Sequence, residues 1–439
     1  MRALPTAISR APMIVVVVLG LTIRLAVAMM FVGSWDVVSQ VYHGELIVAG
    51  ESAWTSKLPV AYFLPAAMHL LADATQLPKT FTQKLPAIAG DLWIALLLYG
   101  IAARLPRAGP RWLWPAIYLL NPVTVMLSAY HGNADPLMGA AMLTALVLRW
   151  RERPLASGVM LGLAIAMKPT ALLALPVLLL PLARRGNVRL AAAAVLTPVA
   201  ICTPFALLDP TFGKFLSNYS GPYGNWGISL ILRQVENVSR QLLGIDGPLV
   251  AILGALNAAF LASGRWILMG ILVLWGLWMM RRLRIGDFEQ NAIAMTATFF
   301  VFYVFTPGFG VQYLSLALPF LLIVSPRLML WLSAVISPYI LGTYLQAGLY
   351  ERYGMDKPIT ARLASLSSAE LTLLVATGLF AIASWLTCVW ILYRLARPAT
   401  APRNGGVPPA EQAASAPLHS GGPGSPMLPT QTARRRHSG

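Results

Sequence analysis

Acidic residues are scarce in this chain, so the position of each one bears on its chemistry. Only 16 of its 439 residues are Asp or Glu. Asp36 closes the sequence Gly33-Ser-Trp-Asp36, directly after a long apolar run. A carboxylate in a partly desolvated cleft can act as a general base that takes a proton from a hydroxyl group. The position equally suits a solvated carboxylate at a helix end, and both interpretations stay open.

Two charged residues lie inside apolar runs, where a charge is costly and usually pairs with another charge or faces a cavity. Arg24 lies within the first apolar run, and Asp91 lies near the start of a later one. We expect Arg24 and Asp91 to form an ion pair. The pair is either structural or helps to hold an anionic group of a substrate.

A short polar turn, His131-Gly-Asn-Ala-Asp135, separates two further apolar runs. His131 and Asp135 are candidates for contacts with sugar hydroxyls, although they also suit a purely structural turn. A metal site needs more ligands than these two. The sequence therefore gives no support for a divalent metal ion, and we expect no cofactor.

Lys168 and Pro169 interrupt the apolar run 155–183 near its middle. Because proline breaks a helix, we expect a hairpin of two short limbs with Lys168 at its tip. Limbs of about 14 residues are about 21 Å long, shorter than the roughly 30 Å hydrocarbon core, and can leave a cavity beside them. Lysine is a competent phosphate ligand, so Lys168 is a candidate for binding an anionic headgroup; snorkelling to the interface is the alternative.

Further polar groups lie close to the membrane surface in the expected topology. Gln312 and Tyr313 lie in the link from Thr306 to Tyr313, which joins two apolar runs. They are candidates for substrate contacts.

The composition excludes a water-soluble enzyme. Of all residues, 57% are hydrophobic and 11% are charged, against about 25% charged in soluble domains. The net charge of +17 would indicate nucleic acid in a soluble chain. In a membrane protein it indicates Lys- and Arg-rich cytoplasmic loops, and no nucleic-acid partner is expected.

Hydropathy and flanking positive charges together predict an all-α, polytopic membrane protein with about 12 transmembrane helices. The expected segments are 12–33, 86–103, 112–130, 135–148, 155–168, 169–183, 190–208, 264–280, 290–306, 308–325, 328–347 and 370–393. This threading places the arginine clusters on one face, so both termini are expected in the cytoplasm. The protein would then be integral to the plasma (inner) membrane.

The same threading predicts one transmembrane domain, 1–397, with external loops at 34–85, 209–263 and 348–369. Within the loops, 58–72 is expected to lie along the interface as an amphipathic helix. The stretch 248–262 is expected to be interfacial or re-entrant. Residues 398–439, rich in Pro, Gly, Ala and Ser, predict a disordered cytoplasmic tail.

The order of these motifs resembles the GT-C superfamily of membrane glycosyltransferases. The resemblance rests on an internal Arg in the first helix, Asp36 just outside it, and the segment Lys84-Leu-Pro-Ala-Ile-Ala-Gly-Asp91. The later motifs His131-Gly-Asn-Ala-Asp135, Ala166-Met-Lys168-Pro169 and Val311-Gln-Tyr313 extend it over about residues 12–325. Some relatives carry a His-Glu-Arg-Tyr type of motif where this chain has Gln312-Tyr313.

The resemblance implies transfer of a mannose-like hexose from a polyprenyl-phosphate sugar to a lipid- or glycan-linked acceptor. It implies Asp36 as the catalytic base on the external, periplasmic side, and Lys168 as a ligand of the carrier phosphate. Inversion at the anomeric carbon, with Arg265 assisting the departing phosphate, is the expected mechanism.

Other function classes compete with this interpretation. A secondary transporter or lipid flippase predicts ionisable residues near the bilayer midplane and internal repeats, whereas polar residues here concentrate near the expected outer surface. A polysaccharide polymerase or a non-enzymatic scaffold stays open.

Overall fold

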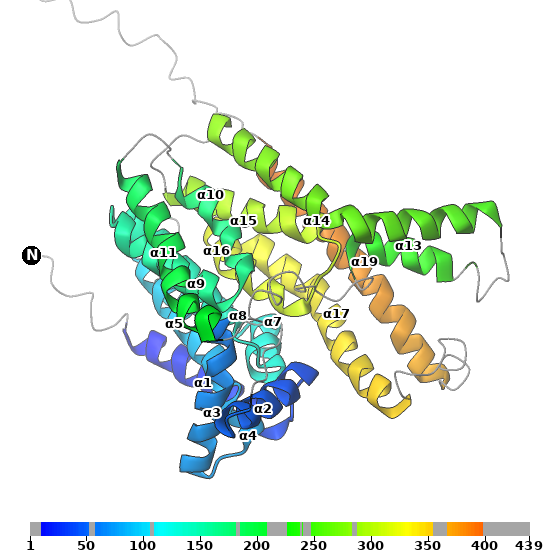
Figure 1. Cartoon of the computed structure of the whole chain (residues 1–439), viewed down its shortest axis with the longest axis horizontal. Coiled ribbons are helices and arrows are strands. Elements are labelled where there is room, and N and C mark those ends of the chain that lie inside the picture. The colour runs from blue at the N-terminus through cyan, green and yellow to red at the C-terminus, as the bar shows by residue number, and fades with distance from the viewer. Residues whose placement is uncertain are drawn as a thin grey trace, which may run out of the picture. The chain divides into compact units, whose positions relative to one another are not determined.

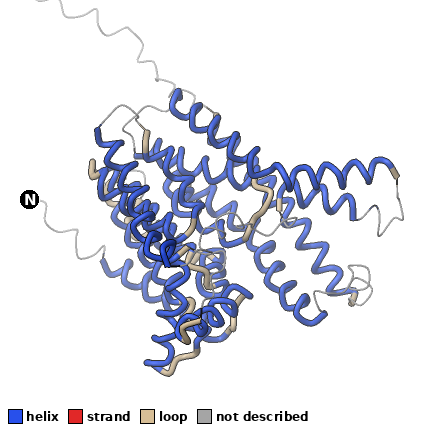
Figure 2. Tube along the Cα trace, in the orientation of Figure 1, coloured by secondary structure: helices blue, strands red, loops and turns tan. Residues whose placement is uncertain are grey.

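The structure is a computed structural model that describes residues 10–51, 58–105, 109–180, 185–208, 226–237, 239, 247–282, 288–353 and 367–397. Within these ranges all regular secondary structure is helical, and no strand occurs (Figures 1 and 2). This confirms the predicted all-α class. The predicted cytoplasmic tail, 398–439, lies outside the described residues.

Long helices alternate with short ones along the chain (Figure 1). The N-terminal half contains α1 (Arg10–Met30), α2 (Trp35–Val48), α3 (Pro59–Thr75), α4 (Lys79–Thr82), α5 (Leu85–Ala102), α6 (Leu113–Leu119), α7 (Pro122–Val125), η2 (Met126–His131), α8 (Asp135–Trp150), α9 (Pro154–Met167), η3 (Pro169–Ala174), α10 (Leu175–Leu178) and α11 (Arg185–Leu208). The C-terminal half contains α13 (Gly227–Asn237), α14 (Pro248–Arg282), α15 (Phe288–Phe305), η5 (Val311–Tyr313), α16 (Leu314–Val324), α17 (Pro326–Tyr353) and α19 (Ser368–Ala396).

Every predicted transmembrane segment overlaps a helix or a group of consecutive short helices. By length and composition, the described residues contain six helices able to cross a membrane, or up to seven if the bent pair α6 with α7–η2 is one span. These apolar helices make the chain an integral membrane protein. The larger number of crossings, about 12 from the charge pattern, stays a prediction.

The stretch 248–262, expected to be interfacial or re-entrant beside the span 264–280, is not a separate element. Both belong to one continuous 35-residue helix, α14. The reason is local: Gly264 is the only glycine or proline at the expected break, and the helix continues through its polar neighbours Ser263 and Arg265. One glycine costs about 1 kcal/mol in a helix interior, which flanking helix formers readily offset.

The predicted break at Lys168 is present. Helix α9 ends at Met167, Lys168 is extended (φ −159°, ψ 132°), and the 3₁₀ turn η3 begins at Pro169. Proline lacks the backbone N–H that would continue the helix, and it disfavours helical geometry in the residue before it. The chain therefore leaves the helical path at Lys168.

The arginine-rich helix ends meet on one side of the bundle. The Arg104 guanidinium lies 5.5 Å from the centre of the Trp150 ring, and that ring lies 4.5 Å from the ring of Phe288. Arg149 Nε donates a hydrogen bond of 3.1 Å to the Leu178 carbonyl. The ends of α5, α8 and α10 and the start of α15 therefore lie together. Asp135, at the other end of the 16-residue helix α8, lies about 22 Å away along the axis.

Helix α5 packs closely on the start of α8 through Gly90. A Cβ atom added to Gly90 would come within 2.6 Å of Pro136 C and Leu137 Cα, closer than packed carbon atoms approach. Gly100, on the same helix, has nothing within 4 Å of such an atom. Gly90 therefore sets the distance between the two helices.

We expect Gly90→Leu to lower the apparent Tm of the detergent-solubilised protein by about 2–6 °C, because overpacking costs about 1–3 kcal/mol and each kcal/mol shifts the Tm of a large chain by about 2 °C. Fluorescence-detected size-exclusion chromatography after heating measures the apparent Tm. Gly100→Leu is the matched control and should leave the Tm within about 1 °C. Equal Tm values for the two variants would contradict this packing.

Candidate active site

Asp36 lies in the first turn of α2, directly after the tight link from α1. Gly33 adopts φ +104°, which favours glycine, and Ser34 precedes the helix with an extended backbone. Ser34 Oγ donates a hydrogen bond of 2.9 Å to the carbonyl oxygen of His131. The link between α1 and α2 is thereby joined to the turn that follows η2.

Two side chains from that second turn surround the Asp36 carboxylate. Asn133 Nδ2 donates a 2.9 Å hydrogen bond to Asp36 Oδ2, and His131 Nε2 lies 3.1 Å from the same oxygen. The Asp36 side chain is 36% exposed, whereas that of His131 is 8% exposed. The structure therefore fixes the orientation of an accessible carboxylate.

His131 ends a π-helical turn, η2, and Gly132 follows it with φ +72°. π-Helical turns frequently occur at functional sites. The His131 ring stacks on Tyr344 of α17, with centroids 5.6 Å apart and planes at 22°. Despite the short distance to Asp36, neither ring nitrogen of His131 has a hydrogen bond of good geometry in the described part of the chain, and nor does the Tyr344 hydroxyl.

A second polar cluster contains Lys168, Asp135 and Tyr313. Lys168 Nζ lies 3.1 Å from both carboxylate oxygens of Asp135 and 4.2 Å from the centre of the Tyr313 ring. The Asp135 side chain is 3% exposed and that of Lys168 is 16% exposed. Asp135 is therefore a buried partner that holds the lysine, and Asp36 is the more accessible carboxylate of the two.

The two clusters belong to one region because a single turn carries both. Only four residue steps separate His131 from Asp135, and an extended chain spans at most about 3.6 Å per residue. Their Cα atoms thus lie within about 14 Å of each other. The structure brings together Asp36, His131, Asp135, Lys168 and Tyr313.

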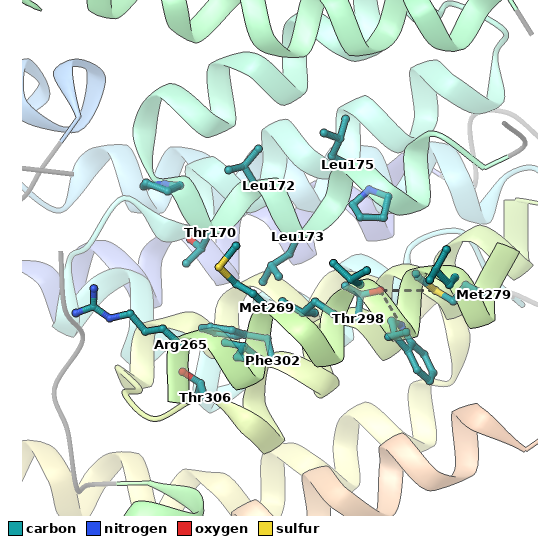
Figure 3. Close-up of a pocket in the computed structure, with 18 of the residues that line it drawn as sticks. Thr170, Leu172, Leu173, Leu175, Arg265, Met269, Met279, Thr298, Phe302 and Thr306 are labelled. Carbon is teal, nitrogen blue, oxygen red and sulfur yellow. Dashed lines mark hydrogen bonds between the residues drawn. The ribbon is translucent and has the colours of Figure 1, made fainter. Parts of the chain in front are cut away.

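A mostly apolar cleft of about 730 Å³ adjoins the second cluster (Figure 3). One wall comes from η3 and α10 and the other from α14 and α15, with Tyr313 among its lining residues. Arg265 and Thr306 lie at one end of the cleft, and Met279 lies at the other (Figure 3). The predicted phosphate candidate Arg265 is therefore at the polar end of an apolar cleft.

Gln312 lies in the 3₁₀ turn η5, and its side chain folds against Gly310. Its backbone carbonyl accepts a 2.8 Å hydrogen bond from Ser315 Oγ. Gln312 therefore neighbours Tyr313 without lining the cleft. Its substrate contact stays a prediction.

Arg24 and Asp91 form the expected ion pair, with Arg24 Nε 2.8 Å from Asp91 Oδ2 and side chains 0% and 1% exposed. Arg24 also donates to the Leu119 carbonyl and to Thr124 Oγ1, and Tyr118 donates to Asp91 Oδ1. A pair that is this buried and this fully bonded matches the structural interpretation. We therefore place neither residue in the candidate substrate site.

Lys84 opens the segment that ends at Asp91, and the sequence assigns it no role of its own. Its side chain is fully buried, and Nζ donates to the carbonyl oxygens of Ala28 (3.0 Å) and Phe31 at the end of α1. The sequence shows only that Lys84 directly precedes a predicted membrane segment. A lysine in that position more often extends to the membrane interface than lies buried.

Comparison with known proteins decides the family. The model of glycosyltransferase family 87 matches residues 59–307, more than half of the chain. The chain belongs to glycosyltransferase family 87. This membership confirms the expected enzyme class, a glycosyltransferase.

Solved structures of low sequence identity are also similar. Two are crystal structures of ArnT from Cupriavidus metallidurans, one in the apo state and one bound to undecaprenyl phosphate. The identities are 16% and 14%, each with a TM-score of 0.48, over 87% of this chain and 76% and 77% of the ArnT chains. No curated protein matches the sequence.

For this family 87 member, we expect Asp91→Asn to destabilise the fold severely, because it leaves the Arg24 charge buried without an acid partner. Breaking a buried ion pair costs about 3–5 kcal/mol. The double variant Arg24→Met/Asp91→Leu should recover much of the apparent Tm, since apolar pairs often replace buried ion pairs at little cost. A double variant less stable than Asp91→Asn would contradict a purely structural pair.

Proposed function

We propose that this glycosyltransferase transfers a mannose-like hexose from a polyprenyl-phosphate carrier to an acceptor hydroxyl, with inversion and with Asp36 as general base. The observation that carries the proposal is that one turn joins two groups: His131 lies beside the accessible Asp36 carboxylate, and Asp135 binds Lys168. Lys168 in turn contacts Tyr313, which lines the apolar cleft. The Asp36 carboxylate suits an acceptor hydroxyl, Lys168 suits a phosphate, and the apolar cleft suits the lipid chain.

The support for Asp36 as the base comes from its surroundings. Asn133 holds one carboxylate oxygen at 2.9 Å, so the orientation does not depend on a substrate. A general base must lie within hydrogen-bonding reach of the proton that it abstracts. Asp36 is exposed enough to meet a hydroxyl, whereas the buried Asp135 is occupied by Lys168.

The cleft suits the lipid chain of the carrier. Its polar end has Arg265 and Thr306, and Met279 lies at its other end (Figure 3). Tyr313 is also among its lining residues. Along α14, the 14 steps from Arg265 to Met279 correspond to about 21 Å, a large part of the hydrocarbon core. A polyprenyl chain in this cleft would place its phosphate beside Lys168 and Arg265.

The proposed reaction is a direct displacement. Asp36 takes the proton of the acceptor hydroxyl, whose oxygen forms a bond to the anomeric carbon. The bond from that carbon to the phosphate oxygen breaks, and polyprenyl phosphate leaves as a monoester. Arg265 and Lys168 stabilise the added negative charge on the phosphate. The leaving group needs no proton, so no general acid is required.

The proposed orientation follows from the two ends of α8. Its arginine-rich end would face the cytoplasm by the positive-inside rule, and Asp135 at its other end would face the outside together with Asp36. The acceptor is then a lipid- or glycan-linked hydroxyl at the outer face of the membrane, and both chain termini lie in the cytoplasm.

We expect Asp36→Asn to lower kcat by about 10²–10⁴-fold, the usual contribution of a general base, while leaving the apparent Tm unchanged. Glycosyl transfer is measured with polyprenyl-phosphate mannose and an extract of membrane lipids as acceptor, with glucose as the second donor sugar. Glu45→Gln is the matched control, because this acid lies on the same helix with its side chain 61% exposed. Transfer by Asp36→Asn at the wild-type rate would refute the base assignment.

We expect Gly276→Phe to fill the cleft and raise the KM for a long-chain donor about tenfold, a loss of about 1.4 kcal/mol. A Cβ atom at Gly276 would lie 3.9 Å from Pro176 Cβ across the cleft. Gly270→Phe is the control, because such an atom at Gly270 meets nothing within 4 Å. An unchanged KM in Gly276→Phe would show that the lipid chain binds elsewhere.

A further inference from the structure

Lys84 is a buried cation at the meeting point of two turns. Its side chain is 0% exposed, and among the described residues no carboxylate lies within ion-pair distance of its ammonium group. Burying a charge without an opposite charge is expensive. Methionine would occupy similar space without that cost, so the ammonium group itself has a role here.

The ammonium group bonds the last turn of α1. The last carbonyl groups of a helix have no partner within the helix, and Lys84 Nζ donates to two carbonyls at this end, those of Ala28 and Phe31. A positive charge also interacts favourably with the negative end of the helix dipole. Lys84 therefore fixes the point at which α1 ends and the link to Asp36 begins.

The aliphatic part of Lys84 lies between two glycines. A Cβ atom at Gly33 would come within 3.0 Å of Lys84 Cε, and one at Gly132 within 2.8 Å of Lys84 Cγ. Both glycines have positive φ, +104° and +72°. Gly33 leads to Asp36, whereas Gly132 lies between His131 and Asn133. One side chain thus packs against the turns that carry both halves of the carboxylate site.

We propose that Lys84 is a positioning residue that sets the distance between Asp36 and its partners His131 and Asn133. It acts through Asp36 and, being fully buried, does not touch a substrate. This inference rests on the proposed function, in which Asp36 is the base. A misplacement of about 1 Å can cost about 10²-fold in rate, so a residue that fixes this geometry affects kcat.

The test compares Lys84→Met with Lys79→Met in the purified full-length chain. Lys79 lies on the adjacent helix α4, with its side chain 38% exposed, and its loss should leave activity unchanged. With polyprenyl-phosphate mannose as donor and a membrane-lipid extract as acceptor, Lys84→Met should lower kcat about 10–100-fold. The donor KM should stay within about threefold, because the cleft is built from other helices.

A second variant keeps the test decisive if Lys84→Met does not fold. Gly132→Ala places a methyl group against Val37 and the Lys84 stem, and it should lower kcat in the same way with little change in donor KM. In both variants, a rise in the donor KM that accompanies the fall in kcat would indicate general damage to the protein and overturn the proposal. A wild-type kcat would also overturn it.

Asp36→Asn separates this inference from the proposed function. If Asp36→Asn retains transfer, the base assignment fails. If Asp36→Asn is inactive and Lys84→Met has the wild-type kcat, only the role of Lys84 fails. Where residual activity is measurable, adding Lys84→Met to Asp36→Asn should lower it by much less than Lys84→Met alone, because residues that act as one unit are non-additive. An equal further loss would overturn the proposal.

Discussion

The ion pair between Arg24 and Asp91 is the interaction on which the positions of the other elements depend. It joins α1 to α5 at complete burial, and the remaining donors of Arg24 reach the end of α6 and the helix α7. A buried charge is tolerated only where an opposite charge and hydrogen-bonding groups lie in the right positions around it. The rotation and depth of α1 are therefore fixed, and with them the place where the chain leaves the helix toward Asp36.

Much of the fold could be predicted because membrane burial leaves strong signals in a sequence. Apolar length and arginine clusters located each long helix, and Lys168-Pro169 marked a break that the structure contains. The junction near Gly264 could not be predicted in the same way. Whether one glycine interrupts a helix depends on the flanking residues, so 248–282 was divided where the structure has one helix.

The sequence could predict which residues belong to the candidate site, but it predicted their roles less well. Rare charges next to apolar runs identified Asp36, Asp135 and Lys168, because such residues are costly unless they are used or paired. The sequence could not show that Asp135 pairs with Lys168, since that contact joins helices that only the tertiary fold brings together. The role of Lys84 could not be predicted either, because a buried and an interfacial lysine look alike in sequence.

The cleft beside α14 has a consequence for how such an enzyme is supplied. Several lining residues, Met269 and Val273 among them, are more than half exposed, so the cleft opens sideways toward the surroundings of the helices. A lipid-linked donor that enters there arrives by diffusion in two dimensions, within one leaflet. The quantity that governs saturation is then the number of carriers per unit area of membrane, which cells can change by altering carrier synthesis or leaflet distribution without changing any aqueous concentration.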